Sequence, residues 1–289
     1  MCAAAGWRKL CRVWTNGLGP WYRTHGRHQL PWRHTRDPWA VLLSEVMLQQ
    51  TQVERVIPYW ERFMDRWPNP AAFAATPFNE VLLHWQGLGY PRRARALWLG
   101  AAVVVADGWP DHETALRSLP GVGPYTARAL LTLAFEKTCP PPLDVNIARV
   151  AARAALGSEP VIASKLAIES AIESAQPRTL SRRDYVFALF DVGALHCRAR
   201  PACAGCPLAA QCRSRERLRL QTPPAPRRQS RYAGSTRQLR GALLEAALQH
   251  DGPLPLDRAR AAVAHLDQAQ QPDAVSNALT SLRHEGLID

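Results

Sequence analysis

Apolar residues recur at intervals of three and four along most of the chain, which is the period of an α-helix with one buried face. Proline and glycine punctuate the segments between these runs. No strand-length alternation of apolar and polar residues stands out before residue 215. The pattern predicts an all-α protein with helices over 37–64, 78–86, 92–107, 112–119, 124–136, 145–156, 161–175 and 182–195.

The last part of the sequence follows a different pattern. Residues 214–234 are basic, rich in proline and poor in aromatic residues, a composition that predicts a linker. After it, residues 235–289 contain three short amphipathic segments, the last followed by Glu285, Gly286 and Leu287. We expect this part to form a small winged-helix-like module with a truncated or minimal wing.

One acidic residue interrupts the apolar face of the first long helix. Asp37 and Pro38 fit a helix cap and a first-turn proline, so the helix starts there. Three of the four residues that lie three and four positions from Glu45 are aliphatic. A carboxyl group in such surroundings either binds a buried partner or stays protonated, because desolvation disfavours its charged form. Glu45 is therefore either a structural residue bonded to backbone or a proton donor.

Residues 119–130, LPGVGPYTARAL, predict a helical hairpin. Gly121 and Gly123 permit a tight turn around Val122, and a new helix begins at Pro124. The unpaired amide groups at such a helix start suit a phosphate, and a phosphate contact grips nucleic acid without reading its sequence. An ordinary tight hairpin is the alternative, but the formal net charge of +12 favours phosphate binding.

Asp144 stands between three prolines and another predicted helix, which fits a helix cap. The alternative is a carboxylate at the mouth of a cleft, held in its ionised form by helix amides opposite a protonated Glu45. Two carboxyl groups in different protonation states are the pattern of glycosidic bond cleavage, in which one donates a proton and the other stabilises positive charge on the sugar.

Composition narrows the class of protein. At 289 residues, 47% of them hydrophobic, the chain can form two domains with a substantial core. It has no apolar run of about 18 residues and no signal-peptide pattern, so we expect a cytoplasmic protein. The net charge indicates a polyanionic partner, and no basic amphipathic helix suggests a membrane instead. The only lysines are Lys9, Lys137 and Lys165.

Four of the seven cysteines lie within sixteen residues, in the spacing C-x5-C-x2-C-x5-C: Cys197, Cys203, Cys206 and Cys212. Such crowding in an intracellular protein predicts a metal site. The spacing favours an iron–sulfur cluster over zinc, because zinc sites usually pair two C-x2-C knuckles. Arg198 and Arg200 lie between the first two ligands, where the cluster would aim them at phosphates. Cys2, Cys11 and Cys139 are packing residues or free thiols.

Taken together, these blocks resemble the MutY-type adenine DNA glycosylases of the helix-hairpin-helix superfamily, which also contains endonuclease III. The resemblance runs from about Trp21 to Cys212 through GRHQLPWR, SEVMLQQTQVERVIPYWERF, GLGYPRRAR, LPGVGPYTARA, LDVNIARV and the four cysteines. It implies two helical lobes, an iron–sulfur cluster lobe formed by 1–36 and 145–213 and a six-helix barrel with the hairpin over 37–144. It also implies one [4Fe-4S] cluster.

The resemblance assigns roles to single residues. Glu45 would protonate the departing adenine at N7, Asp144 would stabilise the oxocarbenium ion, and Asn146 and Tyr125 would organise this site. The residues that would line the pocket for the extruded base are Arg27, Trp32, Leu48 and Asp191. The residues that would wedge into the duplex beside the opposite base are Gln49, Gln50 and Tyr90. Trp32 could equally be core and Tyr90 a loop anchor. A base inside a duplex has to be extruded before reaction, so both pocket and wedge are required.

Lysine distinguishes branches of the superfamily. Endonuclease III-like enzymes carry a hairpin lysine that forms a Schiff base and cleaves the strand. Tyr125 occupies that position here, so the resemblance implies an abasic product and a monofunctional enzyme. The implied partner is double-stranded DNA with a mispaired adenine, bound by a monomer.

Four features differ from the family pattern. The first cysteine interval is one residue shorter than usual, Val145 replaces a glycine beside Asp144, and Phe187 stands where many members have a glutamine that contacts adenine. The residues after Cys212 are too few for the Nudix-like domain with which many members recognise 8-oxoguanine, so the chain resembles a short form.

Three functions follow as hypotheses. The first is hydrolytic removal of adenine mispaired with 8-oxoguanine or guanine in base excision repair. The second is a glycosylase for another mismatched base, suggested by Phe187 and the missing domain. The third is a non-catalytic DNA-binding or redox-sensing protein. Glu45 together with Asp144 argues against the third, because binding requires neither carboxyl group.

Overall fold

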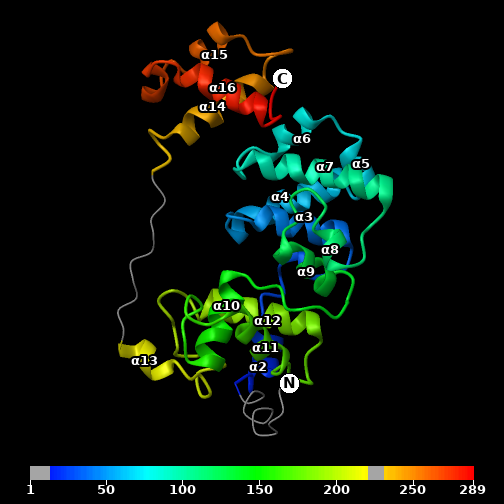
Figure 1. Ribbon diagram of the computed structural model, residues 1–289, viewed down its shortest axis with the longest axis vertical. Helices are drawn as coiled ribbons and strands as arrows, with labels where there is room; N and C mark the ends of the chain where they lie inside the picture. Colours follow the sequence, from blue (N-terminus) through cyan, green and yellow to red (C-terminus); the bar gives the residue numbers. More distant parts are fainter. Residues whose placement is uncertain (1–13, 221–230) are drawn as a thin grey trace. The chain divides into compact units, whose positions relative to one another are not determined.

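The computed structural model describes residues 14–220 and 231–289 (Figure 1). Within these ranges every regular element is helical and no strand occurs, which confirms the all-α class. Backbone contacts group the chain into two compact units, residues 1–45 with 109–226 and residues 46–108 with 227–289. The boundary falls inside helix α3 (Pro38–Leu48), and the division into a cluster lobe and a barrel stays a prediction.

The first unit is built around helix α12 (Arg182–Leu195), whose apolar residues are buried against α2, α9 and α10. Ser181 caps this helix by accepting a hydrogen bond from the amide of Asp184 at 3.0 Å. The other elements of this unit are α2 (Leu18–His25), η1 (Pro31–Arg33), α8 (Glu113–Leu116), α9 (Pro124–Leu133), α10 (Val145–Ala151), the π-helical turn η2 (Ala152–Leu156), α11 (Lys165–Glu173) and α13 (Arg215–Leu220).

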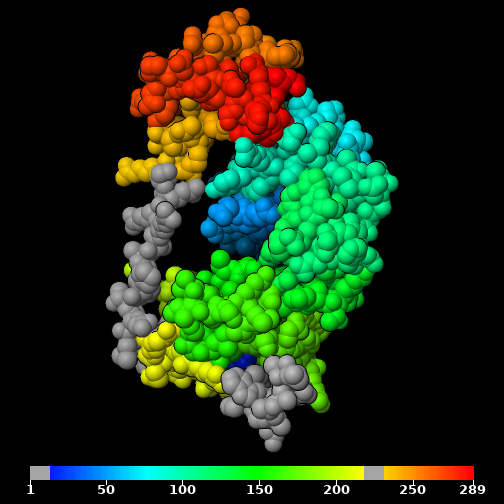
Figure 2. Space-filling model, in the orientation of Figure 1, coloured from blue at the N-terminus to red at the C-terminus, as the bar shows by residue number. Residues whose placement is uncertain are grey.

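The second unit joins two helical clusters. Helix α7 (Pro91–Asp107) packs on α5 (Pro70–Ala74) and α6 (Phe78–Trp85), with α4 (Val53–Arg66) contributing to an aromatic core around Phe63 and Trp85, whose ring centroids are 5.8 Å apart. The three-helix module consists of α14 (Thr236–Leu248), α15 (Leu256–Val263), the turn η3 (Asp267–Gln270) and α16 (Ala274–His284). Figure 2 shows its surface, orange to red, meeting that of the cyan α6–α7 region.

Helix α3 is buried nearly all round, because apolar residues cover its whole circumference. Asp37 caps it by accepting a hydrogen bond from the Trp39 amide at 3.1 Å, as the sequence predicts. The single helix expected over 37–64 is wrong, however, because α3 ends at Leu48 and α4 begins at Val53. The Arg93 guanidinium donates to the carbonyl oxygens of the last turn of α3, and Gln50 adopts φ 61°, so the helix cannot continue.

Other elements correct the expectations in smaller ways. The short helix α5 was not predicted, and α11 begins at Lys165 rather than at 161. The expected linker over 214–234 contains helix α13, and residues 221–230 of it lie outside the described ranges. The described part of the module is helical without a wing strand. None of the helices in the described ranges is long and apolar enough to cross a membrane.

Candidate active site

Glu45 projects from the penultimate turn of α3 into a buried setting, with 7% of its surface exposed. Burial raises the pKa of its carboxyl group from 4.5 to about 7. The Tyr125 hydroxyl, at the start of α9, donates a hydrogen bond to this carboxyl and partly opposes the rise, whereas the nearby Asp144 carboxylate adds to it. Half of such groups are protonated at neutral pH, which is the condition that a general acid requires.

Asp144 is the N-cap of α10, as its position before a helix predicts. Its Oδ1 accepts hydrogen bonds from the amides of Asn146 at 3.0 Å and Ile147 at 2.7 Å, and its Oδ2 accepts one from Asn146 Nδ2 at 2.7 Å. Burial raises the pKa of Asp144 above 3.8, and these three donors oppose that rise because they bind the charged form. Cap and reactive carboxylate are therefore compatible roles for one side chain.

Asn146 is itself fixed on its other side. Arg149, one turn later on α10, donates from Nη2 to Asn146 Oδ1 at 2.7 Å and from Nε to the carbonyl oxygen of Cys197. Gly193 of α12 lies against the same residue, and a Cβ atom there would stand 2.6 Å from Asn146 Cβ. This close approach requires glycine at position 193. It restricts the position of Asn146, whose side chain donates a hydrogen bond to Asp144.

Asp191, expected in the base pocket, is fully buried in an ion cluster. Arg33 donates both Nη atoms to its carboxylate at 2.7 and 2.8 Å, and Arg27 donates Nε at 2.6 Å and its backbone amide at 2.9 Å. Burial opposes ionisation, but the hydrogen bond and charge of Arg33 and the charge of Arg27 hold the pKa of Asp191 below 3.8. Asp191 thus joins α12 to the segment that precedes α3.

The remaining pocket candidates are Trp32, which is next to Arg33 in the chain, and Leu48. Trp32 is buried on η1, and Leu48 is half-buried at the end of α3. Phe187 is buried beneath two guanidinium groups, with the carbon of Arg33 at 4.6 Å from its ring centroid and that of Arg183 at 5.0 Å. A glutamine at this position would lose both stacking contacts. Contacts with these two arginines therefore give the phenylalanine a structural role.

The hairpin has the expected turn. Gly121 adopts φ 79°, Val122 is buried with its amide 3.1 Å from the Leu119 carbonyl oxygen, and Gly123 caps α9. A Cβ atom on Gly123 would meet nothing within 4 Å, so the space before the helix is open. The first helix of the pair, α8, is only four residues long.

The four clustered cysteines are partly buried free thiols. Burial raises the pKa of Cys197, Cys206 and Cys212, that of Cys206 to about 11, and the neighbouring thiols add to each rise. The described residues contain no group of histidine, cysteine and acidic side chains arranged for a single metal ion. Arg153 donates to the carbonyl oxygen of Arg198 at 2.7 Å, and Arg198 and Arg200 themselves are exposed.

The wedge candidates belong to two loops of the second unit. Gln49 is half-buried, whereas Gln50 and Tyr90 are exposed and both adopt positive φ, 61° and 51°. Arg93 joins the two loops: Nη1 binds the carbonyl oxygens at the end of α3, and Nη2 donates at 3.0 Å to Thr51 Oγ1 and to the carbonyl oxygens of Leu88 and Gly89. Its burial lowers the pKa of Arg93 to about 10, which leaves it charged at neutral pH.

Comparisons with known proteins identify the family of this chain. The sequence model of the HhH-GPD superfamily of base excision DNA repair proteins matches residues 43–176. An adenine DNA glycosylase from Mycolicibacterium smegmatis is 39% identical over 93% of this chain and 90% of its own length. The chain belongs to the adenine DNA glycosylase family. It is therefore a DNA repair enzyme, a hydrolase that acts on N-glycosyl bonds.

Solved structures support the same fold. The structure of a thermostable thymine-DNA glycosylase aligns with a TM-score of 0.64 and 29% identity, over 73% of this chain and 99% of that one. A non-covalent endonuclease III–DNA complex aligns with a TM-score of 0.61 over 74% of this chain and 99% of that chain, at 24% identity, which shows the fold alone. The mycobacterial alignment spans enough of the chain to extend into the three-helix module.

Sequence reasoning missed three arginines of this glycosylase. Arg33 binds Asp191, and Arg149 binds Asn146. Arg93 binds the two loops that carry the wedge candidates. In a chain with 36 basic residues, composition does not single them out. The three-residue interval between Asn146 and Arg149 on a predicted helix is the one signal that places two of these side chains together.

Proposed function

We propose that this chain hydrolyses the N-glycosidic bond of adenine mispaired with 8-oxoguanine or guanine. The observation that carries the proposal is the pairing of Glu45, whose pKa is about 7, with Asp144, whose carboxylate accepts three hydrogen bonds. One group can supply a proton while the other bears negative charge, and this division of labour is what glycosidic cleavage needs.

In this mechanism Glu45 gives its proton to N7 of the extruded adenine. The bond between C1′ and N9 then breaks, and its electron pair leaves with the purine. Asp144 stabilises the positive charge that remains on the deoxyribose, Asn146 holds Asp144, and Tyr125 orients Glu45. Water adds to C1′ and returns a proton to Glu45, so adenine and an abasic site are the products.

DNA binding would use the surfaces around this pair. We assign backbone contacts to the hairpin turn at Gly121, Val122 and Gly123 and to the exposed Arg198 and Arg200. Gln49, Gln50 and Tyr90 would enter the duplex where the adenine has left. Arg27, Trp32, Leu48 and Asp191 would shape the base pocket, Asp191 by fixing Arg27 in place.

The enzyme would leave the strand intact. Lys137 is paired with Asp111 at 3.1 Å, and Lys165 lies 3.8 Å from Glu169 on the surface of α11, so neither amine of the described chain reaches the site. Lys9 lies outside the described residues. With Tyr125 in the hairpin, no Schiff base forms there.

The cysteines Cys197, Cys203, Cys206 and Cys212 would hold one [4Fe-4S] cluster. The four thiols fit a cluster in two respects. Buried thiols that raise one another's pKa ionise readily only when a cationic centre binds them. A cluster also holds its ligands farther apart than a single ion does, and the described residues show no arrangement for a single ion. When bound, the cluster supplies structural support to the loop that carries Arg198. Iron and sulfide analysis with visible absorbance tests this assignment against zinc.

Single-turnover base release tests the function. Duplexes carry adenine opposite 8-oxoguanine or guanine, with thymine, uracil and guanine as alternative target bases, and each is analysed with and without alkali. We expect a monomer of 32.1 kDa to release adenine without alkali. We expect strand scission only after alkali treatment. Release of thymine but not adenine would favour the second glycosylase hypothesis, and scission without alkali would contradict the monofunctional assignment.

A further inference from the structure

The segment that follows the last clustered cysteine carries a concentration of positive charge that the contacts assigned above do not use. Residues 213–220 contain four arginines and one glutamate, which gives these eight residues a net charge of +3. Helix α13 belongs to this segment and is drawn in yellow at the end of the first unit (Figure 1). Such a density of arginine is typical of a surface that contacts a polyanion.

The start of this segment is fixed to the π-helical turn η2. The amide of Arg213 donates a hydrogen bond to the carbonyl oxygen of Ala154 at 3.1 Å. The amide of Ser214 donates to the carbonyl oxygen of Arg153 at the same distance, and Ser214 itself is only 1% exposed. Gly157 lies against the segment, since a Cβ atom there would stand 3.3 Å from Arg213 Cβ. The segment is therefore a defined surface of the first unit.

Arg153 also joins this segment to the loop that carries Arg198. Its side chain is 7% exposed and donates from Nη1 to the carbonyl oxygen of Arg198 at 2.7 Å. Its own carbonyl oxygen accepts the hydrogen bond from Ser214. The backbone at Arg198 and the backbone at Ser214 are thus no farther apart than the length of one arginine residue. A duplex bound at Arg198 therefore comes close to the segment after Cys212.

Two arginines of the segment have charges that no carboxylate offsets. Arg217 is neutralised, because its Nη2 lies 3.5 Å from Glu159. Arg213 and Arg215 are exposed, and within the described part of the chain neither forms an ion pair with an acidic side chain. Arg215 Nη1 approaches the carbonyl oxygen of Ala209 at 3.5 Å, which is the limit of a hydrogen bond. Two guanidinium groups are therefore available to a polyanion.

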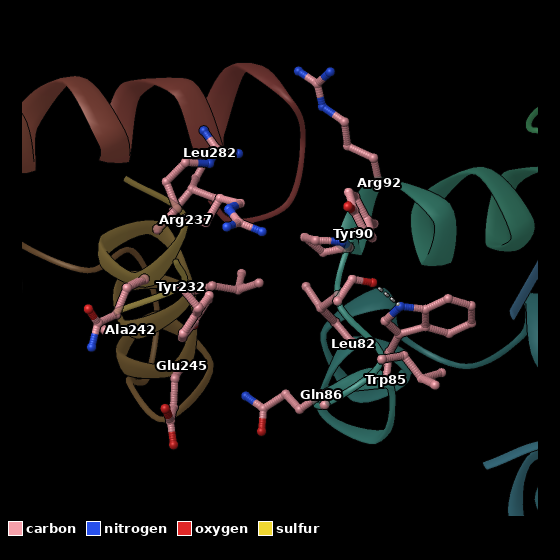
Figure 3. Close-up of a pocket in the computed structure, with 18 of the residues that line it drawn as sticks. Leu82, Trp85, Gln86, Tyr90, Arg92, Tyr232, Arg237, Ala242, Glu245 and Leu282 are labelled. Atoms are coloured by element: carbon pink, nitrogen blue, oxygen red, sulfur yellow. Dashed lines mark hydrogen bonds between the residues drawn. The ribbon is translucent and has the colours of Figure 1, made fainter. Parts of the chain in front are cut away.

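The carboxyl-terminal module has no such surplus. Residues 231–289 contain six arginines and seven acidic residues. Figure 3 shows charges of both signs on helix α14, with Arg237 and Glu245 among the residues that line one cavity of the second unit. Arg240 of the same helix is paired with Glu285 at 2.8 Å. The positive charge that follows Cys212 is therefore concentrated before the module.

We propose that residues 213–217 form a second duplex-binding surface, in which Arg213 and Arg215 bind phosphate groups beside those bound by Arg198 and Arg200. The inference rests on the proposed function, because it takes the DNA of that reaction as the ligand. Guanidinium groups bind phosphates without reading the bases. The surface therefore adds affinity for every duplex, with or without a mispair, and supports the search for a mispair rather than its recognition.

Equilibrium binding to a fluorescent duplex without any mispair tests this surface, because such a duplex offers no base to the pocket. Binding constants are measured by anisotropy between about 50 and 200 mM salt. The double variant Arg213→Gln, Arg215→Gln removes two phosphate contacts. Each contact contributes about 0.9 to the slope of log K against log salt, so the slope should become shallower by about two. Affinity at about 0.1 M salt should fall on the order of tenfold.

Two further double variants serve as controls. Arg258→Gln, Arg260→Gln removes the same charges from α15 of the module, where the two arginines are also exposed and two residues apart. This variant should keep the wild-type slope. Arg213→Lys, Arg215→Lys keeps both charges and should keep most of the slope, because lysine also binds phosphates.

An unchanged slope in Arg213→Gln, Arg215→Gln would overturn the inference. An equal decrease in the α15 variant would also overturn it, because net charge alone would then explain the effect. A lysine variant as weak as the glutamine variant would assign the effect to packing and would count against phosphate binding in the same way. Failure of the wild type to release adenine from any mispair would instead overturn the proposed function, while binding to the duplex without a mispair would still report on this surface.

Discussion

Glu45 and Asp191 are buried carboxyl groups of the same unit, but their surroundings give them opposite charge states. Around Glu45 burial dominates and a tyrosine hydroxyl is the hydrogen-bond partner, so its pKa rises to about 7. Around Asp191 two arginines offset the burial, and its pKa falls below 3.8. Burial alone therefore does not decide whether a carboxyl group is ionised. The presence or absence of neighbouring cationic side chains does. The same unit keeps one acid partly protonated at neutral pH and the other ionised.

Glu45→Gln should give the largest effect on activity. The amide retains the shape of the side chain but cannot transfer a proton, so single-turnover adenine release should fall on the order of 10³–10⁴-fold. Binding to a duplex with an uncleavable adenine should be retained, because the amide fills the same space as the acid. Substantial residual release would show that another group is the proton donor.

Asp191→Asn should instead act on stability. Removal of the charge leaves the buried Arg33 and the half-buried Arg27 without an anion, which costs about 3–5 kcal/mol in the free energy of unfolding. Because the folded pKa of Asp191 lies below its ordinary value, this stabilisation is present above the unfolded pKa and is lost as pH falls. Urea unfolding of wild type and variant between pH 2 and 8 measures it, with Glu45→Gln as the matched control that should not destabilise the fold.

Asp144→Asn separates the two roles of Asp144. Asparagine caps helices about as well as aspartate, so the free energy of unfolding should change by less than about 1 kcal/mol. Loss of the negative charge should lower the rate of base release about 10²–10³-fold. If rate and stability fell together, the residue would be a cap whose loss disturbs the site indirectly.

Tyr125→Phe should give the smallest effect on activity, and that effect should be a shift in its pH dependence. The Tyr125 hydroxyl favours the ionised form of Glu45, so its removal should raise the pKa of Glu45 further above 7. The single-turnover rate of the wild type should fall as pH rises through about 7, and the variant's profile should shift to higher pH by less than about one unit. A shift to lower pH would contradict the assigned direction of this hydrogen bond.

The sequence predicts those parts of the site whose chemistry is local. A glutamate among aliphatic neighbours, an aspartate before a helix and two glycines in a turn indicate their settings from a few adjacent residues. The break after Leu48 was missed because its cause, Arg93, lies more than forty residues away and no proline or glycine marks it. The arginine partners of Asp191 and the contact of Phe187 with Arg33 were missed for the same reason, since they join segments more than 150 residues apart.

The most direct test of the account is the ionisation of Glu45 itself. In protein labelled with ¹³C at the glutamate carboxyl carbons, the signal that is absent from Glu45→Gln belongs to this residue, and its chemical shift is followed from pH 3 to 9. We predict a midpoint at about 7. A midpoint at the ordinary value of 4.5 would mean that Glu45 is ionised at neutral pH, which contradicts its role as the proton donor.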